Sequence, residues 1–105
     1  MVLTVFRSRL RESSREEYLA LAPRIAELAQ AMPGYRSHKS FVAEDGERLT
    51  LVEFDSAEAQ RAWSRQIDHA AAQRRGREAF YTEYHLQICE VLRESRFQAD
   101  PPASA

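Results

Sequence analysis

Strand-like and helix-like segments alternate along this chain in an order that few folds accept. Residues 2–10 alternate with a period of two, which is typical of a β-strand. Two more alternating runs, Tyr35–Ala43 and Arg48–Phe54, are joined by Glu44-Asp45-Gly46-Glu47. An Asp-Gly pair between such runs indicates a β-hairpin. Residues 84–92 alternate again and predict a fourth strand.

Apolar residues at helical spacing fill the two gaps between these strands. The first helical pattern runs from about Ser14 to Ala31. Pro23 lies inside it, and because proline removes a backbone donor at a typical cost of about 3 kcal/mol, the sequence predicts a kink or a break there. The second pattern follows the capping residues Asp55-Ser56 and continues to Gly76. Residues 77–83 could add one short helical piece.

The order β-α-β-β-α-β predicts a ferredoxin-like α+β fold with a four-stranded antiparallel sheet. Right-handed crossovers place both helices on one face of that sheet. The other face is not polar, because Leu49 and Leu51 point to one side of their strand while Val52 and Phe54 point to the other. An uncovered apolar face normally marks an interaction surface, so we expect a homodimer formed through this face.

Composition limits the organisation and the partners. The chain has 105 residues, which is enough for one core, and we expect a domain over residues 1–94 and a disordered tail over residues 95–105. Fifteen basic and sixteen acidic residues leave a net charge of -1, which disfavours nucleic acid and anionic membranes as partners. The single cysteine, Cys89, and the short apolar start predict a cytoplasmic protein without an internal disulfide.

The second predicted helix, between Ser56 and Gly76, carries the side chains that most favour a catalytic or binding role. His69 follows Trp63 by six positions, and histidine is the side chain best suited to acid-base chemistry near neutral pH. Trp63 could form the wall of a site for a flat ligand, and packing in the core is its more common role. A solvated histidine is likewise the more common state for His69. No histidine-carboxylate spacing supports a metal site, and we expect none.

Tyrosines near the ends of the second and fourth strands are candidates for substrate binding. Tyr35, Tyr81 and Tyr84 bring phenol groups that can hydrogen-bond an aromatic molecule, and they could equally cover a dimer contact. His85 starts the predicted fourth strand and is a further candidate for lining a site. A small hydrophobic or aromatic molecule is therefore the expected ligand.

Several of these segments together resemble the antibiotic biosynthesis monooxygenase superfamily. They are Met32-Pro33-Gly34-Tyr35, the strand Leu49–Phe54, the run Asp55–Ala59, and then Trp63 and His69. The resemblance implies a dimeric α+β barrel with its site between sheet and helices. It also implies a cofactor-independent oxygenase, in which a substrate carbanion reacts directly with dioxygen. His69 would deprotonate the substrate and Trp63 with the tyrosines would hold its rings.

The resemblance covers residues 2 to about 93 and leaves two other functions open. A haem-degrading branch shares the tryptophan but expects a histidine ten positions later, where this chain has Gln73, and an asparagine on strand one, where it has Ser8. Both departures disfavour haem, so we expect no cofactor and keep haem as the alternative. Ser8 joins the candidate substrate contacts. The third reading is a non-catalytic dimeric module that binds a small molecule.

Overall fold

The computed structural model describes residues 1–69 and 80–100. Its regular elements occur in the predicted order, with a short 3-10 turn at Glu12–Ser14 between the first strand and the first helix. The elements are β1 (Val2–Leu10), α1 (Arg15–Gln30), β2 (Tyr35–Val42), β3 (Arg48–Phe54), α2 (Ala57–His69) and β4 (Tyr81–Glu90).

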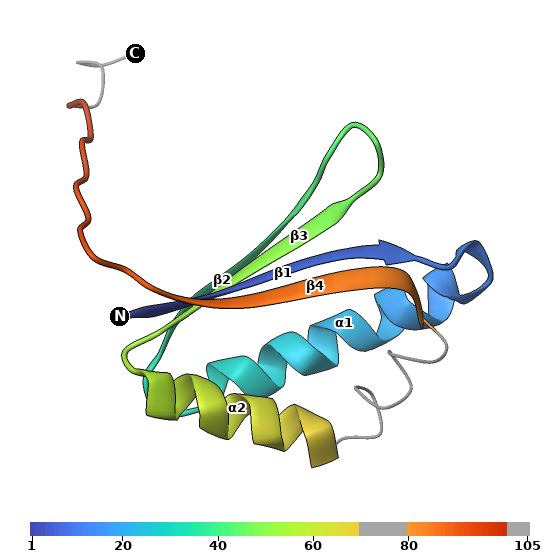
Figure 1. The fold of residues 1–105 in the computed structure, drawn as a ribbon, viewed down its shortest axis with the longest axis horizontal. Helices are drawn as coiled ribbons and strands as arrows, with labels where there is room; N and C mark the ends of the chain where they lie inside the picture. Colours follow the sequence, from blue (N-terminus) through green and yellow to red (C-terminus); the bar gives the residue numbers. More distant parts are fainter. Residues whose placement is uncertain (70–79, 101–105) are drawn as a thin grey trace.

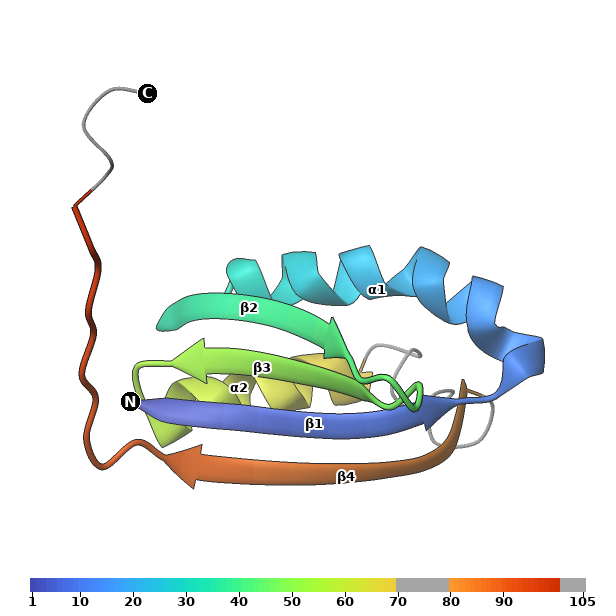
Figure 2. The same cartoon turned by 90° about the horizontal axis from the view of Figure 1, so that it is seen from above.

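The strands form a four-stranded antiparallel sheet in the order β2-β3-β1-β4. Both helices cover the same face of this sheet (Figure 1), as right-handed crossovers require. Seen from above, α1 runs alongside β2 at one edge of the sheet, while α2 lies behind β3 and β1 (Figure 2). The predicted ferredoxin-like fold is confirmed. We call the covered side the helix face and the opposite side the outer face.

The core lies between α2, the end of α1 and the end of β3. Val52, Phe54 and Ala29 are almost fully buried, and Trp63 of α2 packs against them with 8% of its surface exposed. Burying side chains of this size contributes roughly 1.5–3 kcal/mol each, which explains why the helices dock at this end of the sheet.

A helix cap fixes the start of α2, and a glycine fixes the turn before β2. The hydroxyl oxygen of Ser56 accepts a hydrogen bond of 3.1 Å from the backbone N–H of Ala59, which confirms the predicted helix cap. Gly34 has a φ of +84°, and a Cβ built on it would lie 2.8 Å from the Cβ of Ala59. Only glycine accommodates both that backbone conformation and that close approach.

Helix α1 is continuous through Pro23, so of the two predicted outcomes, a kink or a break, the break is wrong. Pro23 has no N–H to donate to the carbonyl of Leu19, four residues earlier. Leu19 is on the exposed side of the helix, so water can donate to this carbonyl instead. Packing of Ile25 and Ala29 on the core then stabilises the helix beyond the proline.

The start of β4 also differs from the prediction. Residues 81–83 belong to the strand and not to a helical piece, because Tyr81 pairs with Leu10 and Glu83 pairs with Arg9. Pairing with β1 therefore decides the conformation of a segment whose local pattern is ambiguous. The strand ends at Glu90, and residues 91–100 have no regular secondary structure. The predicted helical stretch between His69 and Gly76 lies outside the described residues, and so do residues 77–79 of the expected short helical piece.

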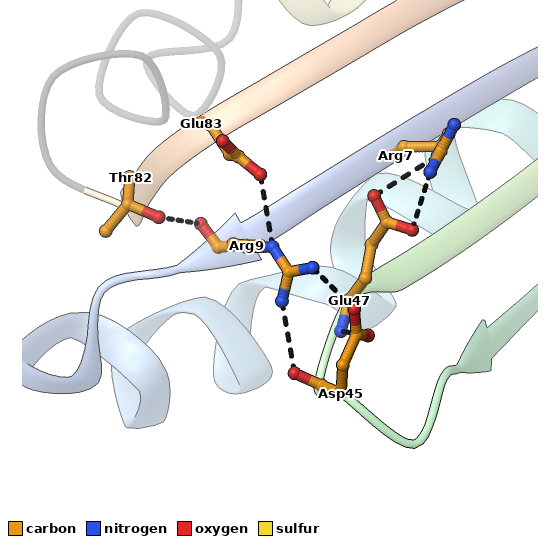
Figure 3. A network of polar contacts seen from close by, with 6 residues as sticks. All are labelled: Arg7, Arg9, Asp45, Glu47, Thr82 and Glu83. Atoms are coloured by element: carbon orange, nitrogen blue, oxygen red, sulfur yellow. Dashed lines mark hydrogen bonds and ion pairs between the residues drawn. The ribbon is translucent and has the colours of Figure 1, made fainter.

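One end of the outer face carries a network of ion pairs (Figure 3). Arg7 contacts Glu47 at 2.9 Å, and Arg9 contacts Asp45 at 2.7 Å and Glu83 at 3.1 Å. The hydrogen bond from Arg9 lowers the pKa of the Asp45 carboxyl. These contacts fasten the β2–β3 hairpin to β1 and β4 at exposed positions, where a single pair contributes about 0–1 kcal/mol.

Away from this network, the outer face carries an apolar area, as predicted. Strand register places Leu3, Val5 and Leu51 on it, since Val5 pairs directly with Leu51 and Leu3 with Glu53. Phe41, paired with Leu49, extends the apolar area to β2 and is 43% exposed. Within the described part of the chain, no helix is long and apolar enough to cross a membrane.

Candidate functional site

A row of side chains crosses the helix face where β1 ends and β3 begins. Ser8 pairs with Arg48 of β3 on one side and with Tyr84 of β4 on the other. Directly paired residues in antiparallel strands point to the same face, so all three lie on the helix face. Ser8 is 3% exposed and forms the floor between the other two.

Aromatic rings surround this row. The ring of Phe6 lies 5.5 Å from that of Tyr81 and 5.6 Å from that of Tyr84, measured between centroids. Tyr18, on the first turn of α1, lies 5.8 Å from both Tyr81 and Phe80 in edge-to-face geometry. Such contacts stabilise a cluster by about 0.5–1.5 kcal/mol per pair. We call these five residues, Phe6, Tyr18, Phe80, Tyr81 and Tyr84, the aromatic cluster.

The phenol of Tyr81 is held in its neutral form. Burial raises its pKa, and the charge interaction and hydrogen bond with Tyr18 raise the pKa further, while the nearby Arg48 acts in the opposite direction. A neutral phenol is a hydrogen-bond donor and a poor base. Tyr81 is therefore suited to holding a substrate oxygen and not to removing a proton.

Arg48 brings a positive charge to the helix face. Its guanidinium carbon lies 5.6 Å from the centre of the Tyr18 ring, a cation–π contact. Its Nε atom is buried and has no hydrogen-bond partner among residues 1–69 and 80–100. A buried donor without a partner costs about 1–3 kcal/mol, so this atom calls for an acceptor.

Trp63 occupies the other end of the helix face. Its ring lies 5.5 Å from that of Phe54, and its indole Nε1 is buried without a hydrogen-bond partner. The hydroxyl of Thr4, paired in register with buried Val52, is also buried without a partner. Trp63 thus anchors the core, the more common of its two expected roles, and it also carries a polar atom that no described group satisfies.

The remaining residues predicted from the sequence are separated by the fold. The ring centroids of Tyr35 and Phe54 lie 6.3 Å apart. Tyr35 is aligned with Val2 of β1 through Phe54, whereas Tyr84 is paired with Ser8. The two tyrosines are therefore separated by about 20 Å along the strands. His85 pairs with Arg7 and therefore points to the outer face. His69 is the last residue of α2, and its side chain lies outside the described part of the structure.

Arg48, Tyr18 and Phe6 are the members of the site that sequence reasoning missed. Arg48 did leave a signal, because residues 48, 50, 52 and 54 share one face of β3, and two of them form the core. A charged residue at an inward position of a strand is unusual enough to single out. Tyr18 left no comparable signal, since its role depends on where α1 crosses the sheet.

No group of three or more histidine, cysteine, aspartate or glutamate side chains gathers at metal-binding distance among residues 1–69 and 80–100. Cys89 is a free cysteine that is partly buried.

Comparison with known proteins places these features in a family context. A family model described as antibiotic biosynthesis monooxygenase matches residues 1–75. An uncharacterized protein of Bacillus subtilis, YqjZ, is 32% identical over 81 residues, which are 77% of this chain and 71% of that protein.

Two solved structures share the fold at lower identity. SnoaB, a cofactor-independent oxygenase from Streptomyces nogalater, superposes with a TM-score of 0.71 and 18% identity over 89% of this chain and 94% of its own. A mutant of MhuD, solved with two manganese protoporphyrin IX molecules per active site, gives a TM-score of 0.66 and 19% identity over 92% and 100% of the two chains.

Proposed function

This chain belongs to the antibiotic biosynthesis monooxygenase family, and from that premise we propose that it is a cofactor-independent oxygenase of a small aromatic or polyketide-type substrate. The observation that carries the proposal is the aromatic cluster, with neutral Tyr81 and the Arg48 guanidinium, on the covered face of the sheet. Rings of this kind hold a flat substrate, and donors of this kind hold its oxygen.

The chemistry uses the substrate as the source of electrons. A base removes a proton from a benzylic carbon that is conjugated with an aromatic ketone, and the resulting carbanion transfers an electron to dioxygen. Recombination forms a carbon–oxygen bond and, after protonation, a hydroperoxide. Loss of water from the hydroperoxide leaves a new carbonyl group. For anthrone, one molecule of dioxygen gives one anthraquinone and one water.

In this proposal each candidate residue has a separate task. His69, at the end of α2, is the base, and Trp63 on the same helix borders the substrate. Tyr81 and Tyr84 hold the rings, and Ser8 forms the floor beneath them. Tyr35 and His85 lie apart from this cluster, so they would contact only a substrate or partner that extends to their positions.

We also propose that the protein works as a homodimer joined through the outer face. Leu3, Val5, Leu51 and the half-exposed Phe41 form an apolar area there. An area of this kind is costly to leave in water, and a symmetric copy of the same sheet covers it economically.

Oxygen consumption with anthrone tests the proposed activity. We expect the rate to fall at least about tenfold in His69→Ala, since a general base contributes about 10²–10⁴-fold. The rate should also fall in Trp63→Phe, because the smaller ring no longer borders the substrate in the same way. Arg24→Gln, at an exposed position of α1, is the control for a changed surface charge and should keep the rate. Unchanged rates in both site variants would contradict these assignments.

A haem-dependent function is the second candidate, favoured by the likeness to the porphyrin-bound MhuD structure. Titration with hemin separates the two functions. A saturable shift of the Soret band at one or two equivalents would support the haem candidate, and its absence would remove it. Binding of aromatic ligands without any oxygen uptake would instead support the non-catalytic binding module.

A further inference from the structure

Among the described residues, Arg48 is the charged side chain with a buried polar atom that lacks a hydrogen-bond partner. It is partly buried at the first position of β3, facing the helices beside Ser8. A guanidinium stays charged at every accessible pH, so it cannot reduce the cost of burial by losing a proton. The cation–π contact with Tyr18 offsets part of that cost, and no group in the described part of the chain accepts a hydrogen bond from the N–H of Nε.

Among residues 1–69 and 80–100, the polar groups that border Arg48 in the aromatic cluster are hydroxyl groups, which can donate hydrogen bonds. Tyr81 is a neutral phenol, Tyr18 is bonded to it, and Ser8 brings a hydroxyl in the adjacent strand position. A site of donors around a fixed positive charge matches an oxygen that carries negative charge. The surrounding rings of Phe6 and Tyr84 favour an oxygen attached to a flat aromatic system.

We propose that Arg48 binds the ionised oxygen of the substrate, which would therefore be an acidic phenol or an enolisable aryl ketone bound as its oxyanion. This inference rests on the proposed function and deepens it, because removing a proton from a carbon conjugated with an aromatic ketone places negative charge on the ketone oxygen. Arg48 would stabilise that charge through its guanidinium N–H groups.

Ligand titration separates this site from a purely apolar one. An apolar site disfavours the charged form and raises the pKa of a bound phenol, whereas a guanidinium lowers it. The probe is 2-hydroxyanthraquinone, whose visible colour changes on ionisation, and 2-methoxyanthraquinone is the matched ligand that cannot ionise. Quenching of Trp63, the single tryptophan, measures binding of both.

We expect the apparent pKa of the bound hydroxyl dye to fall by about one unit or more, which corresponds to a tenfold preference for the oxyanion. Arg48→Gln should remove this preference and leave the affinity for the methoxy dye within about twofold. Arg24→Gln should change neither quantity. A raised pKa of the dye bound to the unmodified protein would overturn the proposal even if the Arg48 variants did not fold.

The outcomes also distinguish this inference from the oxygenase proposal. A lowered dye pKa without oxidation of anthrone would support the Arg48 site and contradict the oxygenase function. Equal binding of both dyes with an unshifted pKa would contradict the role of Arg48 and leave an aromatic-binding site. Failure of both dyes to bind would contradict the inference together with the aromatic substrate on which it rests.

Discussion

The ring of Trp63 packs on the ring of Phe54 with their centroids 5.5 Å apart, and this contact joins α2 to β3. We expect Trp63→Ala to lower the free energy of unfolding by about 3–5 kcal/mol, as is typical for a large buried aromatic. Trp63→Phe should cost less than about 1.5 kcal/mol, because it keeps a ring and removes a buried N–H that has no partner.

Urea unfolding followed by circular dichroism, at one fixed protein concentration, measures both values. A loss of less than about 1 kcal/mol in Trp63→Ala would show that the indole is not a core anchor.

Gly34 and Gly46 form a matched pair for separating backbone strain from steric contact. Both have a positive φ, +84° and +90°, but only Gly34 faces a neighbouring atom, the Cβ of Ala59. Gly46→Ala should therefore cost about 1–2 kcal/mol from the backbone alone, and Gly34→Ala at least about 1 kcal/mol more. Ala59→Gly should recover part of the extra loss in a double variant. Equal losses at the two glycines would contradict the close approach.

Burial of Tyr81 predicts a loss of stability at high pH. The pKa of Tyr81 is raised by burial and by Tyr18, so above about pH 10 the unfolded chain releases this proton while the folded chain keeps it. The folded state then binds more protons, and stability falls as pH rises. Tyr81→Phe should make the decline between pH 9 and 11 shallower, by up to about 1.4 kcal/mol per pH unit. Parallel declines in both proteins would contradict this.

A charge placed on the outer face should change the oligomeric state, because the proposed dimer contact lies there. Val5 and Leu51 are paired across β1 and β3 on that face, so Leu51→Glu should convert a dimer into monomers in sedimentation velocity experiments. Leu19→Glu, at a position on α1 that is 45% exposed, is the control and should leave the dimer intact. An unmodified protein that stays monomeric at every concentration, or an unaffected Leu51→Glu dimer, would contradict the proposed interface.

The fold could be predicted from local patterns because each element carried its own signal. Asp45-Gly46 marked the hairpin, Ser56 capped α2, and the register of β3 separated Leu51 from Val52. The start of β4 was not predictable in the same way, because residues 81–83 become a strand only through pairing with β1. Local sequence does not report such long-range pairing.

The site was only partly predictable for the same reason. Tyr81 and Tyr84 lie together as an aromatic pair, but Tyr35, which shared their chemistry, lies at the other end of the sheet. His85 and Tyr84 are adjacent in sequence and point to opposite faces, which only the register decides. Arg48 lies in the site because of its position on β3, and no sequence motif marks it.

The most direct test of the central claim is the origin of the oxygen atom in the product. The unmodified protein, free of added metal and haem, would be incubated with anthrone under isotopically labelled dioxygen. We predict anthraquinone with one labelled oxygen atom, formed at a saturable rate above the uncatalysed background and with one dioxygen consumed for each product. A rate equal to background, or product whose new oxygen comes from water, would contradict the proposed oxygenase.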